Sequence, residues 1–159
     1  MSASAPRTFS ITRTAHTSAS PERVLPLIQD FHAWETWSPW EGLDPDLTRV
    51  YTGPERGVGS RYSWDGDRKA GAGSMEMTRC DDDGVELDLV FTRPVAGENH
   101  VRIDVTPAAD GGSALAWTMS GPQSRLHAIL FRVLRMERML AKDFDRGLEQ
   151  LSRRASDRT

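Results

Sequence analysis

One long amphipathic stretch, residues 123–154, constrains the fold of this chain more than any other feature. Its apolar residues recur at steps of three and four, the spacing that places side chains on one stripe of an α-helix. They are Leu126, Ile129, Leu130, Val133, Met136, Leu140, Phe144, Leu148 and Leu151. No other segment has helical periodicity of comparable length, so strand-like segments upstream must cover this stripe. The sequence therefore predicts one long helix held against a curved sheet.

Glu137 interrupts the apolar stripe, because it lies on the same helical face as Val133, Leu140 and Phe144. The plainer interpretation is that the helix breaks near Arg135. The alternative is that the carboxylate faces the interior, where it needs a partner or a raised pKa because an isolated charge in an apolar site is costly. On this second interpretation Glu137 is a candidate functional group.

Length and composition favour one domain over residues 1–159, because a chain of this size buries about 70% of its unfolded surface without disulfides or metal. Residues 1–6 and 155–159 are small or charged and are expected to fray. The sequence shows no apolar leader segment and no run of about 18 apolar residues. We therefore expect a soluble, cytoplasmic protein without stable membrane insertion.

Charge, cysteine and histidine content exclude several classes of site. The formal net charge is −3 and the basic residues are interspersed with acidic ones, so no nucleic-acid surface is indicated. A single cysteine, Cys80, excludes an internal disulfide and favours a reducing compartment, and its thiol is expected to be inert. The histidines lie in unrelated segments without metal-ligand spacing, so we expect no metal. Gly57-Val58-Gly59 lacks the third glycine and the following helix of a nucleotide-binding loop, and we expect no cofactor.

Two short helices are predicted after the first strand. Residues 8–16 alternate between apolar and polar and predict that strand. A helix then begins with Ser20 as N-cap and Pro21 at the first helical position, where no N–H is needed. Pro26 removes an intrahelical hydrogen bond, so this helix is expected to end around Asp30.

Three of the five tryptophans lie in residues 31–45. Trp34 and Trp37 are three residues apart and would share a helical face, and Ser38-Pro39 ends this second helix before Trp40. These indoles either plug the junction of helix and sheet or line the mouth of a ligand cavity, since aromatic walls are typical of such cavities.

Six further strands are predicted before the long helix. In residues 85–91 and 100–105, apolar residues alternate with charged ones, which is typical of antiparallel strands with one solvated face. We expect the charges to form cross-strand pairs on this outer face rather than a catalytic cluster. The other four strands are predicted at residues 47–51, residues 60–65, the segment around Met75 and Met77, and residues 113–121.

Short motifs follow one another along nearly the whole chain. They are S-P-E-x-V at 20–24, W-S-P-W followed by D-P at 37–45, G-P-x-x-G-V-G-x-x-Y-x-W at 53–64, F-x-x-P at 91–94, W-x-M-x-G at 117–121 and K-D-F-x-x-G-L-x-x-L at 142–151. In this order they resemble the START-like, or SRPBCC, superfamily with its helix-grip, Bet v 1-like fold, and within it the polyketide cyclase/dehydrase-like branch.

The resemblance implies an α+β fold in which a seven-stranded antiparallel β-sheet wraps around a long C-terminal α-helix. It also implies two short helices between strands 1 and 2, and a cavity between sheet and long helix. Relatives use that cavity for apolar small molecules such as lipids, sterols, plant hormones and polyketides. The superfamily has no shared catalytic signature, so the resemblance transfers no catalytic residue to this sequence.

The leading hypothesis is that the cavity binds a hydrophobic or aromatic small molecule, lipid or polyketide-like, in a monomer or weak homodimer. Burial of such a ligand contributes roughly 25 cal/mol per Å² before ordering costs, and flexible methionines would adapt to its shape. The predicted lining consists of Trp37, Tyr62, Trp64, Met75, Met77, Phe91, Trp117, Met119, Met136, Leu140 and Phe144.

Two further hypotheses remain open. A polyketide cyclase/dehydrase-type enzyme would use the same cavity, with Glu137 or Tyr62 as acid or base within about 3 Å of the reacting atom. Arg93 could assist, although its place before Pro94 favours a surface charge at a strand end. A protein-binding, co-chaperone-like module would instead have a filled core and an exposed apolar patch, for which residues 34–40 are the place to look.

Overall fold

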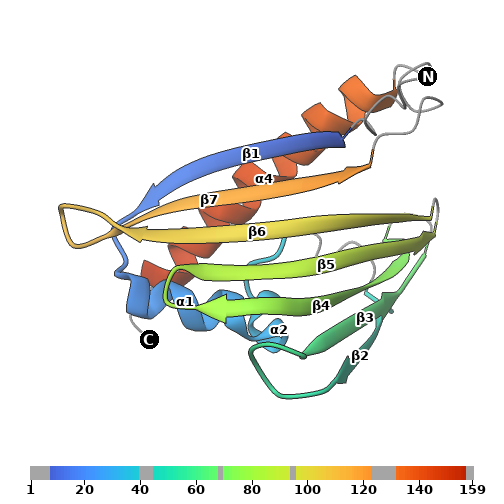
Figure 1. Cartoon of the computed structure of the whole chain (residues 1–159), viewed down its shortest axis with the longest axis horizontal. Helices are drawn as coiled ribbons and strands as arrows, with labels where there is room; N and C mark the ends of the chain where they lie inside the picture. The colour runs from blue at the N-terminus through green and yellow to red at the C-terminus, as the bar shows by residue number, and fades with distance from the viewer. Residues whose placement is uncertain (1–7, 40–44, 68–69, 94–95, 123–131, 157–159) are drawn as a thin grey trace, which may run out of the picture.

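The computed structural model describes residues 8–39, 45–67, 70–93, 96–122 and 132–156. Within this part of the chain a strand is followed by two short helices, six strands and a long helix (Figure 1). The elements are β1 (Thr8–Thr17), α1 (Pro21–Gln29), α2 (Phe31–Trp34), β2 (Thr48–Thr52), β3 (Arg61–Asp65), β4 (Ala72–Asp81), β5 (Gly84–Arg93), β6 (Gly97–Pro107), β7 (Ser113–Pro122) and α4 (Arg132–Ser156).

The seven strands form one antiparallel sheet in the order β1-β7-β6-β5-β4-β3-β2. Strands β2 to β7 are joined in sequence, whereas β1 crosses over to pair with β7. Helices α1, α2 and α4 lie on the same face of the sheet, which curves around them (Figure 1). The predicted fold class, an α+β helix-grip fold with two short helices after the first strand, is confirmed.

The two short helices differ in detail from the sequence interpretation. Ser20 has the extended conformation of an N-cap and Pro21 opens α1, but the Ser20 side chain makes no capping hydrogen bond. Helix α1 ends at Gln29, and the Asp30 carboxylate then accepts a hydrogen bond of 2.9 Å from the His32 N–H, which caps α2. Helix α2 is only four residues long, so Trp37 lies in the turn after it rather than on a helix.

Helix α4 is continuous from Arg132 to Ser156. The interpretation that the long helix breaks near Arg135 is therefore wrong for the described residues, while the side chain of Glu137 lies outside them. The expected fraying from residue 155 is also wrong at its start, because Ala155 is helical and only 4% exposed. Its methyl group continues the apolar stripe one turn beyond Leu151.

Several interactions attach α4 to the rest of the fold, and three of them fix its position closely. Arg13 on β1 donates two hydrogen bonds of 2.8 and 2.6 Å to the Asp145 carboxylate, a bidentate pair that fixes the position of the helix along the strand. Arg146 donates a hydrogen bond of 2.8 Å to the carbonyl oxygen of Pro39. Gly147 lies directly against the Trp117 ring and Pro39, a close approach that only a residue without a side chain permits.

The outer face of the sheet carries the expected charge pairs. The His100 ring bonds to the Glu86 carboxylate at 2.8 Å and to Asp88 at 3.3 Å, across β5 and β6. Arg79 on β4 contacts the same Glu86 carboxylate from the other side. Partial burial alone would lower the pKa of His100, but its hydrogen bonds to the two carboxylates outweigh burial and raise the pKa. The prediction of a wetted, paired outer face is confirmed for these residues.

Replacement of Gly147 by alanine tests the contact between α4 and the core. An added Cβ would lie 2.8 Å from Cζ3 of Trp117 and 2.9 Å from Cδ of Pro39, so the helix must move. Overpacking of a core destabilises a protein by about 1–3 kcal/mol. Alanine in place of glycine stabilises a helix by roughly 1 kcal/mol, which offsets only part of that loss. We expect G147A to lower Tm by roughly 3–6 °C in thermal unfolding. G97A is the matched control, since a Cβ there meets no atom within 4 Å; equal Tm values for the two variants would contradict this packing.

The His100 pairs predict a pH-dependent contribution to stability. The pKa of Glu86 is lowered, chiefly by its hydrogen bond to His100 and then by its hydrogen bond to Arg79. The pKa of His100 is raised. The His100–Glu86 pair therefore contributes its full stability below the ordinary histidine pKa. This contribution is lost as pH rises through the raised pKa of His100, and also as pH falls through the lowered pKa of Glu86. We expect H100Q to lose about 0.5 kcal/mol at pH 5.5 in urea unfolding and close to nothing at pH 9. A loss that grows with pH would contradict the assignment.

Candidate functional site

A cluster of four aromatic side chains fills the space between β7, α2 and the C-terminal half of α4. The Trp117 and Phe144 rings stack with centroids 4.5 Å apart, and Trp37 meets Trp34 at 4.6 Å and Trp117 at 5.7 Å. The indole N–H groups of Trp34 and Trp37 donate to backbone carbonyl oxygens of α1. All four residues are buried, and Trp37 is only 1% exposed. This cluster, named here the core cluster, is densely packed interior.

A second set of aromatic residues crosses the other half of the same sheet face. Tyr51, Tyr62, Trp64 and Phe91 follow one another over β2, β3 and β5, with ring centroids 5.2, 6.0 and 5.9 Å apart. Phe31 of α2 contacts Tyr62 at 6.2 Å, which places the set on the side of the helices. Tyr62 is 8% exposed and the other three are half-buried. We name Tyr51, Tyr62, Trp64 and Phe91 the aromatic row.

Gly73 on β4 determines how the aromatic row lies. A Cβ at this position would be 2.7 Å from Cη2 of Trp64 and 2.4 Å from the carbonyl oxygen of Val90. The missing side chain lets the indole of Trp64 extend across β4 and meet Phe91 edge-on, at an interplanar angle of 86°. The Trp64 N–H donates a hydrogen bond of 3.0 Å to the carbonyl oxygen of Ala70. The contact of the Trp64 ring with the Gly73 backbone and this hydrogen bond hold the aromatic row in place.

Tyr51 gives the aromatic row a polar end. Its hydroxyl donates a hydrogen bond of 2.5 Å to the Glu35 carboxylate, which Arg49 also contacts at 3.3 Å, and the His32 ring stacks on the phenol at 3.9 Å. Burial, and then the bond to Glu35, raise the pKa of Tyr51, so it remains a neutral phenol at physiological pH. No sequence motif pointed to Tyr51, although it pairs opposite Tyr62 in the β2–β3 hairpin, a signal that strand register can supply.

The structure divides the predicted cavity lining into two groups. Trp37, Trp117 and Phe144 belong to the core cluster, and Met77 is equally buried. Tyr62, Trp64 and Phe91 belong to the aromatic row, with Met75 beside Tyr62 in register. Among the others, Met119 is buried, Leu140 is half-buried, and the side chains of Met136 and Glu137 lie outside the described residues.

Other residues that the sequence singled out are buried or paired in the structure. Trp34 and Trp37 are buried and so provide no exposed apolar patch, while Trp40 lies outside the described residues. Arg93 ends β5 and pairs with Asp65, as expected of a strand-end surface charge. Burial raises the pKa of the half-buried Cys80 thiol, which makes it a poor nucleophile.

No group of three metal-ligating side chains occurs in the part of the chain that the structure describes. In that same part, none of the helices combines the length and apolar character needed to cross a bilayer.

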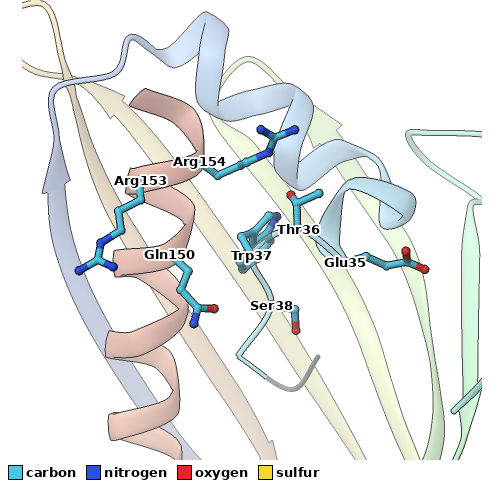
Figure 2. Close-up of a pocket in the computed structure, with 7 residues that line it drawn as sticks. All are labelled: Glu35, Thr36, Trp37, Ser38, Gln150, Arg153 and Arg154. Atoms are coloured by element: carbon cyan, nitrogen blue, oxygen red, sulfur yellow. The ribbon is translucent and has the colours of Figure 1, made fainter. Parts of the chain in front are cut away.

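A polar groove lies at the surface beside the core cluster, between the turn after α2 and the last turns of α4. Its volume is about 440 Å³, and the two segments that form it are far apart in sequence. The lining residues are Glu35, Thr36, Trp37, Ser38, Gln150, Arg153 and Arg154 (Figure 2). No sequence motif indicated this groove, because only the packing of α4 against the segment around Pro39 brings the two segments together.

Solved structures show the same fold at low sequence identity. A Staphylococcus aureus protein of unknown function, SA2116, has a TM-score of 0.70 at 9% identity, over 94% of each chain. Ara h 8.0201 has a TM-score of 0.61 at 10% identity, over 94% of this chain and 98% of that one. DynU16, a protein in the dynemicin biosynthetic locus, has a TM-score of 0.61 at 15% identity, over 91% of this chain and 46% of that one.

Sequence comparison gives the family. No curated protein is similar to this chain at a significant level. The family model described as polyketide cyclase/dehydrase and lipid transport matches residues 8–156, nearly the whole chain. Taken with the seven-stranded sheet around α4, this match shows that the chain belongs to the polyketide cyclase/dehydrase and lipid transport family.

Proposed function

We propose that this protein binds a hydrophobic small molecule with a planar, aromatic or polyketide-like part against the aromatic row. The observation that carries the proposal is the contrast between the two halves of one sheet face. The core cluster is fully buried, whereas Trp64 and Phe91 are only half-buried. Half-buried rings on a concave face gain apolar burial when a ligand covers them, at roughly 25 cal/mol per Å².

The arrangement of α4 supports this location. Among the strands it packs chiefly on β1, with a smaller contact on β7, and it also packs against α1. The described part of α4 therefore covers the β1 side of the sheet more completely than the strands that carry the aromatic row. Leu140, half-buried on α4, and Met75 on β4 would complete the apolar surroundings of a ligand, and Met136 is assigned to them on sequence grounds alone.

The family match supports the ligand class. Its description joins polyketide chemistry with lipid transport, two kinds of ligand that are largely apolar. A structural neighbour comes from the dynemicin biosynthetic locus, although the low identity restricts that likeness to the fold. The rings of the aromatic row, held by Gly73 and by neighbouring side chains, favour a planar ligand over a flexible one because stacked faces match flat molecules.

The setting in which this binding occurs is also part of the proposal. The free Cys80 suits a reducing, cytoplasmic environment. The net charge of −3, with mixed surface ion pairs, gives no basic surface of the kind that nucleic-acid binding requires. A small-molecule binding role requires neither a cofactor nor a partner chain, in keeping with a monomer or weak homodimer.

Substitution of Trp64 tests the aromatic row directly. We expect W64L to weaken binding of the neutral fluorescent probe N-phenyl-1-naphthylamine by about tenfold, because a stacking face worth roughly 1–1.5 kcal/mol is lost. W64F keeps an aromatic face and should lose less than threefold. The measurement is a fluorescence titration of each purified variant, after circular dichroism has shown that it is folded.

V50A is the matched control for this titration. Val50 lies on neighbouring β2, is 49% exposed and points to the opposite side of the sheet from Tyr51, so its loss should leave probe affinity unchanged. If W64L binds the probe as tightly as V50A, the ligand does not lie on the aromatic row.

The second candidate function is catalysis in the same place, by an enzyme of the polyketide cyclase/dehydrase type. The family description favours it, and so do the two phenol groups of Tyr51 and Tyr62 on the wall that would face the ligand. Polyketide cyclisation needs an acid or base beside the reacting carbonyl. Tyr62 is the candidate that the sequence analysis named, and its ring lies in the middle of the aromatic row, between Tyr51 and Trp64.

Catalysis predicts a specific effect of removing one hydroxyl group. With N-acetylcysteamine thioesters of linear β-polyketones, the protein should form cyclised product faster than buffer alone, as measured by liquid chromatography and mass spectrometry. Y62F should lower this rate by about 10²-fold while probe affinity changes less than twofold. Equal rates with and without protein would leave binding as the function, and an active Y62F would remove Tyr62 from the mechanism.

A further inference from the structure

One polar side chain, Asn99 on β6, faces the same side of the sheet as the aromatic row. In the antiparallel register Asn99 lies opposite Leu89, and Gly97 lies opposite Phe91. Because paired residues point to the same side of a sheet, Asn99 shares the concave face with Leu89, which is 3% exposed, and with the half-buried Phe91. Asn99 is thus the diagonal neighbour of Phe91, at the roughly 7–8 Å typical of such pairs.

The Asn99 side chain is half-buried, and its amide forms no hydrogen bond in the part of the chain that the structure describes. Ser113, another inward-facing polar residue on β6 and β7, is instead bonded to the carbonyl oxygen of Ala19 at 2.8 Å. Partial exposure allows solvent to satisfy the Asn99 amide. A ligand that covers the neighbouring ring of Phe91 would remove this solvent, and a buried amide without partners is costly. The ligand must therefore supply a partner for Asn99.

Open space lies beside this amide. A Cβ built on Gly97 would meet no heavy atom within 4 Å, whereas a Cβ on Gly73 would collide with the Trp64 ring. The two glycines on the concave face therefore differ: the space above Gly73 is filled by an indole, and the space above Gly97 is open. A ligand group can lie over Gly97, between the Phe91 ring and the Asn99 amide.

The other polar end of the aromatic row is less suited to this contact. The Tyr51 hydroxyl already donates its hydrogen bond within the chain. The ring of Tyr62, which is 8% exposed, lies between Tyr51 and Trp64. A ligand that covers the half-buried rings of Trp64 and Phe91 has Asn99 as the nearer polar neighbour.

We propose that Asn99 selects ligands with a neutral carbonyl group at one edge of a planar body, and that its amide N–H groups bind this oxygen over Gly97. This inference rests on the function proposed above and specifies the ligand as an aromatic ketone or quinone. An asparagine amide has two N–H donors and a single acceptor oxygen, which favours an accepting group on the ligand. The inward-facing residues of β6 and β7 are uncharged, so a carboxylate would lose its hydration there without a countercharge.

The test compares 9-fluorenone with fluorene, the same ring system with a methylene group in place of the carbonyl. Affinities are measured by displacement of N-phenyl-1-naphthylamine. We expect the wild type to bind fluorenone about fivefold more tightly than fluorene, the usual effect of one hydrogen bond. N99D keeps the shape of the side chain but loses the N–H donors, and N99L has a similar size without polar atoms. Both variants should reduce the affinity ratio to less than twofold.

E98Q is the matched control. Glu98 is exposed and points to the opposite side of the same strand, so this variant should keep the wild-type ratio. Three results would overturn the inference: equal binding of fluorenone and fluorene by the wild type, an unchanged ratio in N99D and N99L, or tighter binding of the alcohol 9-fluorenol than of fluorenone. The last result would mean that the amide oxygen, and not its N–H groups, contacts the ligand.

The W64L variant separates this inference from the proposed function. It should weaken fluorenone and fluorene alike and preserve their ratio, because the ring stacks on both compounds while Asn99 contacts only the ketone. If W64L weakens both compounds and the wild type binds them equally, the aromatic row is the site and only the role of Asn99 is wrong. If neither compound displaces the probe, or W64L has no effect, the proposed function fails and the role of Asn99 fails with it.

Discussion

The stacking of Phe144 on Trp117 is the contact on which the rest of this fold depends. The two rings are nearly parallel, 9° apart, and join the long helix to β7 near the middle of the molecule. Gly147, one turn further along α4, brings the helix backbone against the same indole. Because α4 is fixed here, its Arg146 reaches Pro39 and the two segments of the polar groove meet. Together with the Arg13–Asp145 pair, this aromatic contact fixes where helix, sheet and the turn after α2 lie.

The attachment of α4 at β7 gives tight packing there and less cover on the other half of the sheet. The described part of α4 lies against β1 and β7, so it covers the strands that carry the aromatic row less completely. The row is instead ordered from within the sheet, by the space above Gly73 and by the hydrogen bond of the Trp64 indole. Trp64 and Phe91, which are held in this way, would contact a ligand without loss of core packing. The dense half gives stability, and the other half is where we propose that the ligand binds.

Much of the fold was predictable from the sequence, whereas the site was predictable only in part. Alternation of apolar and charged residues in β5 and β6 is a local pattern that the structure confirms, and so is the apolar stripe of α4 from Leu140 to Leu151. The predicted start of the stripe, Leu126, Ile129 and Leu130, and the side chains of Val133 and Met136 lie outside the described residues. The division of the aromatic residues into core cluster and aromatic row was not predictable, because both sets face the same way and have the same composition. Tertiary contacts decide that Trp37 and Trp117 are covered while Trp64 is left half-buried. The groove depends on such contacts entirely.

The family motifs themselves explain why resemblance identifies the fold better than the ligand. Trp37 and Pro39 of the W-S-P-W motif pack against Trp117 of W-x-M-x-G and Gly147 of K-D-F-x-x-G-L-x-x-L. Three motifs distant in sequence therefore meet at one place, the attachment of α4. Their residues are buried and make contacts that any ligand of the family would leave unchanged. Tyr62 and Trp64 of G-P-x-x-G-V-G-x-x-Y-x-W and Phe91 of F-x-x-P lie instead on the aromatic row, where Trp64 and Phe91 are half-buried. On our proposal, the specificity for the ligand arises there and not at the attachment of α4.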